Sequence, residues 1–252
     1  MNVDRIIPLE LPILPVVYCL LVDCEKGGVG KSTYARVLAQ WLIDKQLDKQ
    51  VIGIDCDRSN QNFEDYYRNA IPMQHAFFTE DSRQSWQADN LLETALEYQA
   101  HIIADLPAQT YRSQLNYFLN GGLRAARQRR VQFVKFFMCA CYYSAEQFIN
   151  SLNAFRNETA HDLVLNEGLC ESFSFLDDYE EFQTALAQQP FPIISMPEIS
   201  YREREIINAF RLTYAEAIES EHLTITGQQR VVDFLMDSYE QLDRLELFDR
   251  EK

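Results

Sequence analysis

The segment from Val22 to Thr33 constrains the fold of this chain more than any other. It reads Val-Asp-Cys-Glu-Lys-Gly-Gly-Val-Gly-Lys-Ser-Thr, follows an apolar run over residues 16–22, and precedes residues 34–42, whose apolar spacing is helical. Strand, glycine-rich loop, Lys-Ser and helix, in that order, are the layout of a phosphate-binding loop. The glycines let backbone N–H groups turn toward phosphate oxygens, and the helix start adds its positive dipole end. The pattern therefore predicts a nucleotide site between a strand and a helix.

The side chains of this loop have separate predicted roles. The Lys31 ammonium would reach the β- and γ-phosphates, and the Ser32 hydroxyl would ligate Mg²⁺. The backbone of the loop would surround the phosphates along its whole length, which comprises Gly27, Gly28, Val29, Gly30, Lys31, Ser32 and Thr33. The loop therefore predicts that the chain binds Mg²⁺ and a nucleotide with β- and γ-phosphates.

The rest of the chain alternates between strand and helix patterns, which predicts an α/β fold. We expect a doubly wound, mostly parallel sheet with helices on both faces. The expected strands are residues 16–22, 51–55, 101–105, 131–140, 162–166 and 192–196. The expected helices are residues 31–46, 60–69, 84–99, 110–119, 144–157, 177–188, 201–218 and 228–247. The least patterned region, residues 71–90, is predicted to be a variable insertion.

The length of the chain, 252 residues, suits one large α/β domain. Residues 1–15 contain acidic residues and three prolines among apolar ones, so we interpret them as an N-terminal arm and not as a signal peptide. The last segment, residues 228–252, is predicted to be an acidic amphipathic helix. Its charge would be repelled by anionic lipid, so we expect it to pack on the domain or on a partner.

Two further predicted strands end in carboxylates. Residues 51–54 lead into Asp55-Cys56-Asp57, and residues 101–104 lead into Asp105. A carboxylate at the carboxyl end of a parallel strand points into the ligand crevice of such a fold. Asp105 would hold Mg²⁺ through its water shell, as a Walker B aspartate does. For Asp57, capping of the following helix stays open as an alternative.

The string Lys-Gly-Gly-Val-Gly-Lys-Ser, residues 26–32, resembles the deviant Walker A loop of the ParA/MinD family of ATPases. The resemblance implies an ATP-dependent homodimer in which Lys26 reaches the nucleotide of the partner. It implies that Asp57 positions or deprotonates the attacking water, and that Asp55 supports the magnesium side. Asp105-Leu-Pro-Ala is similar to the switch II segment of that family.

The sequence also departs from the family pattern. Glu25 replaces the usual first glycine of the loop, and Arg58-Ser59-Asn60 stands where Pro-Gln-Gly is usual after the second aspartate. The resemblance further implies that Asn166 contacts the adenine base and that Pro197 lines the base pocket through its backbone. A turn-forming role explains Asn166 almost as well.

The net charge is −15, which opposes non-specific binding to nucleic acid or to anionic lipid by the whole surface. The only dense basic cluster comprises Arg124, Arg127, Arg129, Arg130 and Lys135. It is either a patch for DNA phosphates or a solvated helix end. The six cysteines lie mostly in apolar runs, which suits thiols in a reducing cytoplasm. Cys139 and Cys141 are half of a metal site at most, so we expect core packing.

The resemblance implies a cytoplasmic, Mg²⁺-dependent ATP hydrolase that works as a dimerisation switch. The expected task is partition, stability or positioning of plasmid or chromosomal DNA, including on a conjugative element, with an adaptor protein that stimulates hydrolysis. The alternatives are a positioning ATPase for a protein cargo and an ATP-dependent ligase of the same fold, similar to dethiobiotin synthetase. A third alternative, a metal-cluster carrier, is disfavoured because the sequence has no Cys-x-x-Cys motif. No apolar run is long enough to span a bilayer, so no membrane partner is expected.

Overall fold

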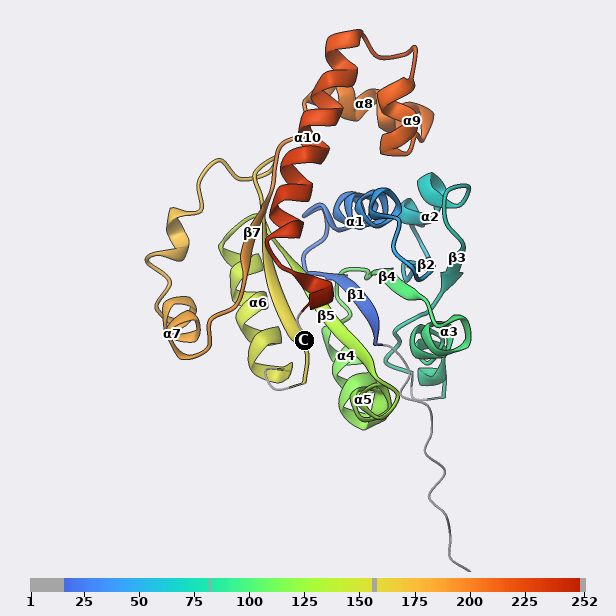
Figure 1. Ribbon diagram of the computed structural model, residues 1–252. Helices are drawn as coiled ribbons and strands as arrows, with labels where there is room; N and C mark the ends of the chain where they lie inside the picture. The colour runs from blue at the N-terminus through green and yellow to red at the C-terminus, as the bar shows by residue number, and fades with distance from the viewer. Residues whose placement is uncertain (1–15, 82, 156–157, 250–252) are drawn as a thin grey trace, which may run out of the picture.

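The computed structural model describes residues 16–81, 83–155 and 158–249, so the predicted N-terminal arm lies outside the described residues. Seven strands form one sheet in the order β3-β2-β4-β1-β5-β6-β7 (Figure 1). Every pairing within it is parallel. The strands are β1 (Val17–Asp23), β2 (Val51–Asp55), β3 (Met73–His75), β4 (His101–Asp105), β5 (Val131–Cys139), β6 (Ala160–Asn166) and β7 (Ile193–Met196).

Helices cover both faces of this sheet. Figure 1 shows α1 and α10 on one face, and α3, α4, α5 and α6 on the other. The α-helices are α1 (Lys31–Lys45), α2 (Asn62–Tyr67), α3 (Asn90–Tyr98), α4 (Tyr111–Tyr117), α5 (Leu123–Gln128), α6 (Tyr142–Phe155), α7 (Glu180–Gln188), α8 (Tyr201–Phe210), α9 (Tyr214–Glu219) and α10 (Ile225–Asp243). This arrangement confirms the predicted doubly wound α/β fold.

Strand β1 lies at the centre of the sheet, and all of its residues are buried. Tyr18 and Leu20 join the hydrophobic core on one face, whereas Cys19 and Leu21 join the core on the other. Successive side chains of a strand point to opposite faces, so a strand that is covered on both sides must be apolar throughout. This requirement explains the uninterrupted apolar run before the phosphate loop.

The carboxyl ends of the central strands meet at one edge of the sheet. Asp105 is in register with Val22 of β1 and with Asp55 of β2. Helix α1 begins at Lys31 on the same edge. The phosphate loop and the two acidic strand ends, which lie far apart in the sequence, are therefore brought together by the parallel topology.

Several elements differ from the sequence prediction. The predicted helix 201–218 is two helices, α8 and α9, because Arg211 turns into the left-handed region and Thr213 starts a new helix with a capping box to Glu216. The region 71–90 contains the short edge strand β3 and a 3₁₀ turn, Ser85–Ala88. Helix α5 was not predicted.

Helix α10 packs on its own domain. Its residues Val231, Phe234 and Leu242 are buried in the main core. Asp243 at its end accepts a hydrogen bond of 2.9 Å from the Trp41 indole of α1. We predicted that the acidic C-terminal segment packs on the domain or on a partner. The structure shows it packed on the domain. Among the helices of the described residues, none combines the length and the apolar character that a membrane span requires.

Candidate nucleotide-binding site

The phosphate loop needs glycine at two positions. Gly28 has φ of 75° and Gly30 has φ of 95°, in the left-handed region that side chains disfavour. A Cβ atom on Gly30 would also lie 2.5 Å from the Asn166 Nδ2 atom. The loop can therefore form a tight curl only with these glycines, and the curl places backbone N–H groups at the start of α1, where an anion is favoured.

Lys31 is almost fully buried, and its ammonium bonds to its own loop. The Nζ atom donates to the Cys24 carbonyl oxygen at 2.9 Å and to the Lys26 carbonyl oxygen at 3.2 Å. An ammonium group has three donor hydrogens, so one stays available for a phosphate oxygen. Both acceptors are neutral, and the positive charge of Lys31 is therefore not cancelled by a direct carboxylate partner.

Asp105 has the features expected of a residue that faces a metal-bound water. Its side chain is buried, and its Oδ1 atom has no hydrogen-bond partner among the described residues. Burial raises the pKa of Asp105 to about 7, although a hydrogen bond from Ser32 opposes this. A buried carboxylate oxygen without a donor is costly unless a ligand completes it. The Ser32 hydroxyl and the Asp105 carboxylate are therefore oxygen ligands of the kind that would hold a hydrated Mg²⁺ ion.

Asp55 does not fit such a role equally well. Its Oδ2 atom accepts from the backbone N–H groups of Phe63 and Glu64 at 3.1 and 3.2 Å, and its Oδ1 atom accepts from Asp57 at 3.1 Å. These bonds satisfy the first N–H groups of α2. The magnesium role predicted for Asp55 therefore has to compete with a capping role, and the contacts favour capping.

Asp57 does not cap α2, whose first N–H groups are held by Asp55, but forms a local turn beside the cleft. Its Oδ1 atom accepts from the backbone N–H groups of Ser59 and Asn60 at 2.8 and 3.2 Å, which forms an Asx turn. The same residue lines a cleft of about 590 Å³ together with the phosphate loop and Asp105. The turn fixes the backbone of Asp57 at the mouth of the cleft, while the residue still borders the space that a triphosphate would fill.

Other cleft residues were not predicted. Arg36 lines the cleft from the second turn of α1, and its guanidinium lies 4.1 Å from the centroid of the Tyr66 ring. Its Nη2 atom also donates to the Thr33 hydroxyl at 3.2 Å. A basic residue five positions after the loop lysine is the sequence signal that identifies it in retrospect.

This site lies in a fold that is known from other proteins. A variant of McdA from Cyanothece, solved as a complex with ATP, superposes with a TM-score of 0.50 and 15% identity, over 87% of this chain and 95% of that chain. A ParA family ATPase from Chlorobium tepidum gives a TM-score of 0.50 and 12% identity, over 87% and 98% of the two chains. The chain has the fold of the ParA-family ATPases.

In sequence, the chain is similar to Protein TraL from Escherichia coli, with 27% identity over 241 residues, 86% of this chain and 94% of that protein. No protein-family model matches the chain. The structural matches confirm at the level of the fold the ParA/MinD resemblance that residues 26–32 carry.

A second, smaller cavity adjoins the phosphate loop of this ParA-type fold. It has a volume of about 170 Å³, and Asn166 and Pro197 line it together with Gly30. The Asn166 Nδ2 atom donates to the Val29 carbonyl oxygen at 2.9 Å, and its Oδ1 atom accepts from Gly168 at 3.1 Å. Asn166 thus braces the phosphate loop. The adenine contacts predicted for Asn166 and Pro197 are compatible with their place beside this cavity.

Lys26 is exposed on the outer side of the loop. Its Nζ atom lies 3.2 Å from the Sγ atom of Cys141, the residue before α6. Partial burial opposes ionisation, but hydrogen bonds from Ser144 and Lys26 lower the pKa of the Cys141 thiol below its usual value. Cys139 is buried at the end of β5, as core packing requires, but Cys141 lies beyond the strand and is only partly buried, so core packing was the wrong prediction for that residue.

The predicted basic cluster is only partly on the surface. Arg124, Arg127, Arg129 and Arg130 are exposed around the end of α5, and Arg127 forms an ion pair with Glu158. The inclusion of Lys135 was wrong, because this residue is fully buried in β5 and pairs with Asp23 at 2.8 Å. Its position in a central strand, not at the strand start, is what buries it. The exposed arginines precede the amino end of β5, at the sheet edge opposite the phosphate loop.

Proposed function

We propose that this chain is a Mg²⁺-dependent ATPase that acts as an ATP-driven dimerisation switch. The observation that carries the proposal is the cleft in which Lys31, Ser32, Asp57 and Asp105 line one continuous space around the curled loop. Two ATP-loaded protomers would bind face to face through these clefts, and hydrolysis would return them to monomers. The resemblance of residues 26–32 to the deviant Walker A loop supports this mode over a permanently monomeric enzyme.

The residues would divide the work of hydrolysis. Lys31 and the loop N–H groups would hold the β- and γ-phosphates, and Lys26 of each protomer would approach the nucleotide of the other. Ser32 and Asp105 would hold Mg²⁺, which when bound neutralises charge on the phosphate oxygens. Asp57 would orient the attacking water at the cleft mouth. Asn166 and Pro197 would border the adenine.

The proposed task of the switch is partition, stability or positioning of plasmid or chromosomal DNA, including on a conjugative element. An adaptor protein that stimulates hydrolysis is the proposed partner, and a protein cargo is the alternative. Direct DNA binding would use the exposed arginines Arg124, Arg127, Arg129 and Arg130. The similarity to Protein TraL and to the McdA and ParA folds supports a positioning ATPase in general.

The proposal is tested by measuring ATP binding, turnover and mass together. We expect binding of ATP that requires Mg²⁺ for turnover, and a shift from monomer to dimer in light scattering with a slowly hydrolysed ATP analogue. Asp57→Ala should bind ATP, hydrolyse it about 100-fold more slowly and accumulate as a dimer. Asp81→Ala is a suitable control, because Asp81 is a carboxylate outside the residues that line the cleft. Full turnover by a protein that stays monomeric would refute the switch and favour the ligase alternative.

A further inference from the structure

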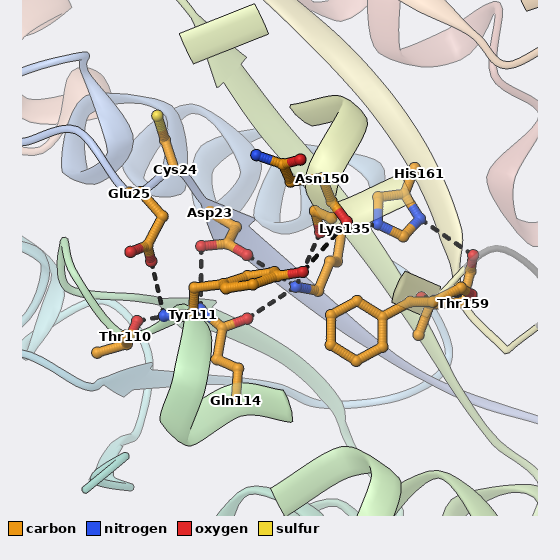
Figure 2. Close-up of polar contacts among 12 residues, drawn as sticks. Asp23, Cys24, Glu25, Thr110, Tyr111, Gln114, Lys135, Asn150, Thr159 and His161 are labelled. Atoms are coloured by element: carbon orange, nitrogen blue, oxygen red, sulfur yellow. Dashed lines mark hydrogen bonds and ion pairs between the residues drawn. The ribbon is translucent and has the colours of Figure 1, made fainter. Parts of the chain in front are cut away.

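The segment that follows Asp105 leads into α4, and this helix is capped from the phosphate loop. Its N-cap residue, Thr110, makes no side-chain capping bond within the described structure. Instead, the Glu25 Oε1 atom accepts a hydrogen bond of 2.7 Å from the Tyr111 backbone N–H, as Figure 2 shows. The Glu25 carbonyl oxygen accepts a second bond, of 3.3 Å, from the Gln109 N–H. Glu25 therefore supplies the hydrogen-bond acceptor that the first N–H group of α4 does not receive from the N-cap side chain.

A second carboxylate, that of Asp23 at the end of β1, holds the next turn of α4. The Asp23 Oδ1 atom accepts from the Gln114 amide nitrogen at 3.1 Å, and that nitrogen also donates to the Thr110 hydroxyl at 3.0 Å. Lys135 donates to the amide oxygen of Gln114 at 2.7 Å and to Asp23 at 2.8 Å, so both ends of the amide are fixed (Figure 2). All three of these charged or amide side chains are buried.

The backbone between these contacts is under constraint. Gln109 has φ of 62°, a left-handed conformation that costs free energy for a residue with a side chain. Such a conformation persists only where its surroundings hold it. Here the bonds of Gln109 and Tyr111 to Glu25 lie on either side of Thr110, so Glu25 restrains the end of the segment 106–110.

We propose that Glu25, supported by Asp23, is a positioning residue that couples the phosphate loop to residues 106–110. This inference rests on the proposed ATPase function, and it concerns the regulation of the nucleotide-binding site. Glu25 directly precedes Lys26 and Gly27, so a movement of the loop on phosphate binding is passed to Gln109 and Tyr111 by two hydrogen bonds. The segment beside Asp105 then changes position together with the loop.

The experiment compares Glu25→Ala with Glu25→Gln. Glutamine keeps an oxygen that accepts from the Tyr111 N–H, whereas alanine leaves that N–H without its partner. In hydrogen exchange, peptides that cover residues 107–117 should lose about ten-fold protection in Glu25→Ala and little in Glu25→Gln. In turnover assays, kcat should fall about ten-fold in Glu25→Ala, with ATP affinity changed less than about two-fold, and Glu25→Gln should restore it.

Glu97→Ala is the matched control, because Glu97 is an exposed carboxylate on α3 and should change neither readout. Unchanged exchange at residues 107–117 in Glu25→Ala would overturn the contact. Increased exchange with wild-type kcat would overturn the coupling and leave only a structural cap. Failure of the wild-type protein to bind ATP would instead refute the proposed function, while the exchange result would still decide whether Glu25 caps α4.

Discussion

Positive charge is held at two opposite edges of one sheet, and the two regions hold it differently. At the carboxyl edge, Lys31 bonds to backbone carbonyls and Lys26 to a thiol. At the amino edge, the arginines around the end of α5 are exposed, and Arg127 is paired with the carboxylate of Glu158. Neutral acceptors orient a cation without cancelling its charge, whereas a carboxylate partner cancels much of it. The carboxyl edge is therefore the better anion site of the two.

Lys135 explains how the charge of Lys31 stays uncancelled. Asp23 lies near Lys31, and the charge of Lys31 is one of the influences that lower the pKa of Asp23. The ion pair with Lys135 and the hydrogen bond from Gln114 engage both oxygens of this carboxylate. The difference between the two regions thus depends on a buried ion pair at Asp23, the last residue of β1 before the loop.

The largest expected effect is therefore on stability. Lys135→Met leaves Asp23 as a buried carboxylate without its cation, which should lower the free energy of unfolding by about 3–5 kcal/mol. Urea denaturation followed by circular dichroism measures this change. Asp23→Asn/Lys135→Met removes the unpaired charge and should recover part of the loss. Equal losses in the single and double variants would show that the ion pair is not the cause.

The same pair predicts a pH dependence. Burial alone would raise the pKa of Asp23, but the Lys135 ammonium and its hydrogen bond outweigh burial and hold the pKa below its usual 3.8. A depressed carboxylate pKa adds stability above the unfolded-state pKa, and this is lost as the pH falls through the folded-state value. Without Lys135, burial should raise the pKa of Asp23 above 3.8, so the stability gap between wild type and Lys135→Met should begin to shrink as the pH falls through that raised value, and it should stop shrinking below the depressed wild-type pKa.

The next largest effect is on nucleotide binding. Lys31→Ala removes the cation that neutral acceptors hold in the cleft, and ATP affinity should fall at least about 100-fold, or about 2.7 kcal/mol. Calorimetric titration measures it. The double variant Arg124→Ala/Arg127→Ala removes two cations at the other edge. If it weakened ATP binding as much as Lys31→Ala, the carboxyl edge would not be the better anion site. We expect that double variant to stay within about two-fold of wild type.

A smaller effect is expected for Lys26, which contacts Cys141 and is not among the residues that line the cleft. Lys26→Ala should leave ATP binding within about two-fold and weaken ATP-dependent dimerisation about ten-fold, because the charge that offsets the two triphosphates is lost. Sedimentation equilibrium with a slowly hydrolysed ATP analogue measures the dimer constant. Cys141→Ser keeps a polar partner for Lys26 and is the control. Unaltered dimerisation in Lys26→Ala would contradict the proposal that Lys26 reaches the nucleotide of the partner.

The phosphate loop could be predicted from sequence because its signal is contiguous. Glycines, Lys31 and Ser32 stand within a few positions of each other. The uninterrupted apolar runs likewise predict strands that are buried on both faces. The contacts that hold the start of α4 could not be predicted, because Tyr111 lies 86 positions from Glu25 and Lys135 lies 112 positions from Asp23. Only the fold shows that such residues meet.

Other errors have local causes. Strand β3 has three residues, too few to show an alternating pattern. Helix α5 follows Gly121-Gly122, which suggests a turn, although Gly122 has helical backbone angles. The division between α8 and α9 did carry a signal that was overlooked, since Thr213 and Glu216 have the spacing of a capping box.

The smallest expected effect concerns the arginines of the amino edge. Arg127→Glu/Arg130→Glu should leave ATP affinity and turnover within about two-fold of wild type, because these residues lie across the sheet from the cleft.

If the cluster binds DNA, the affinity for DNA should fall steeply with salt, with a slope of about −0.9 for each phosphate contacted. Four arginines thus allow a slope of about −4 per protomer at most, and the double variant should lower it by about two. Fluorescence anisotropy of a labelled duplex over a range of salt concentrations, with and without ATP, measures both slopes. The net charge of −15 opposes any binding outside this cluster. Tight, salt-insensitive binding, or binding that the double variant retains in full, would therefore place the DNA contact elsewhere and end the case for this patch.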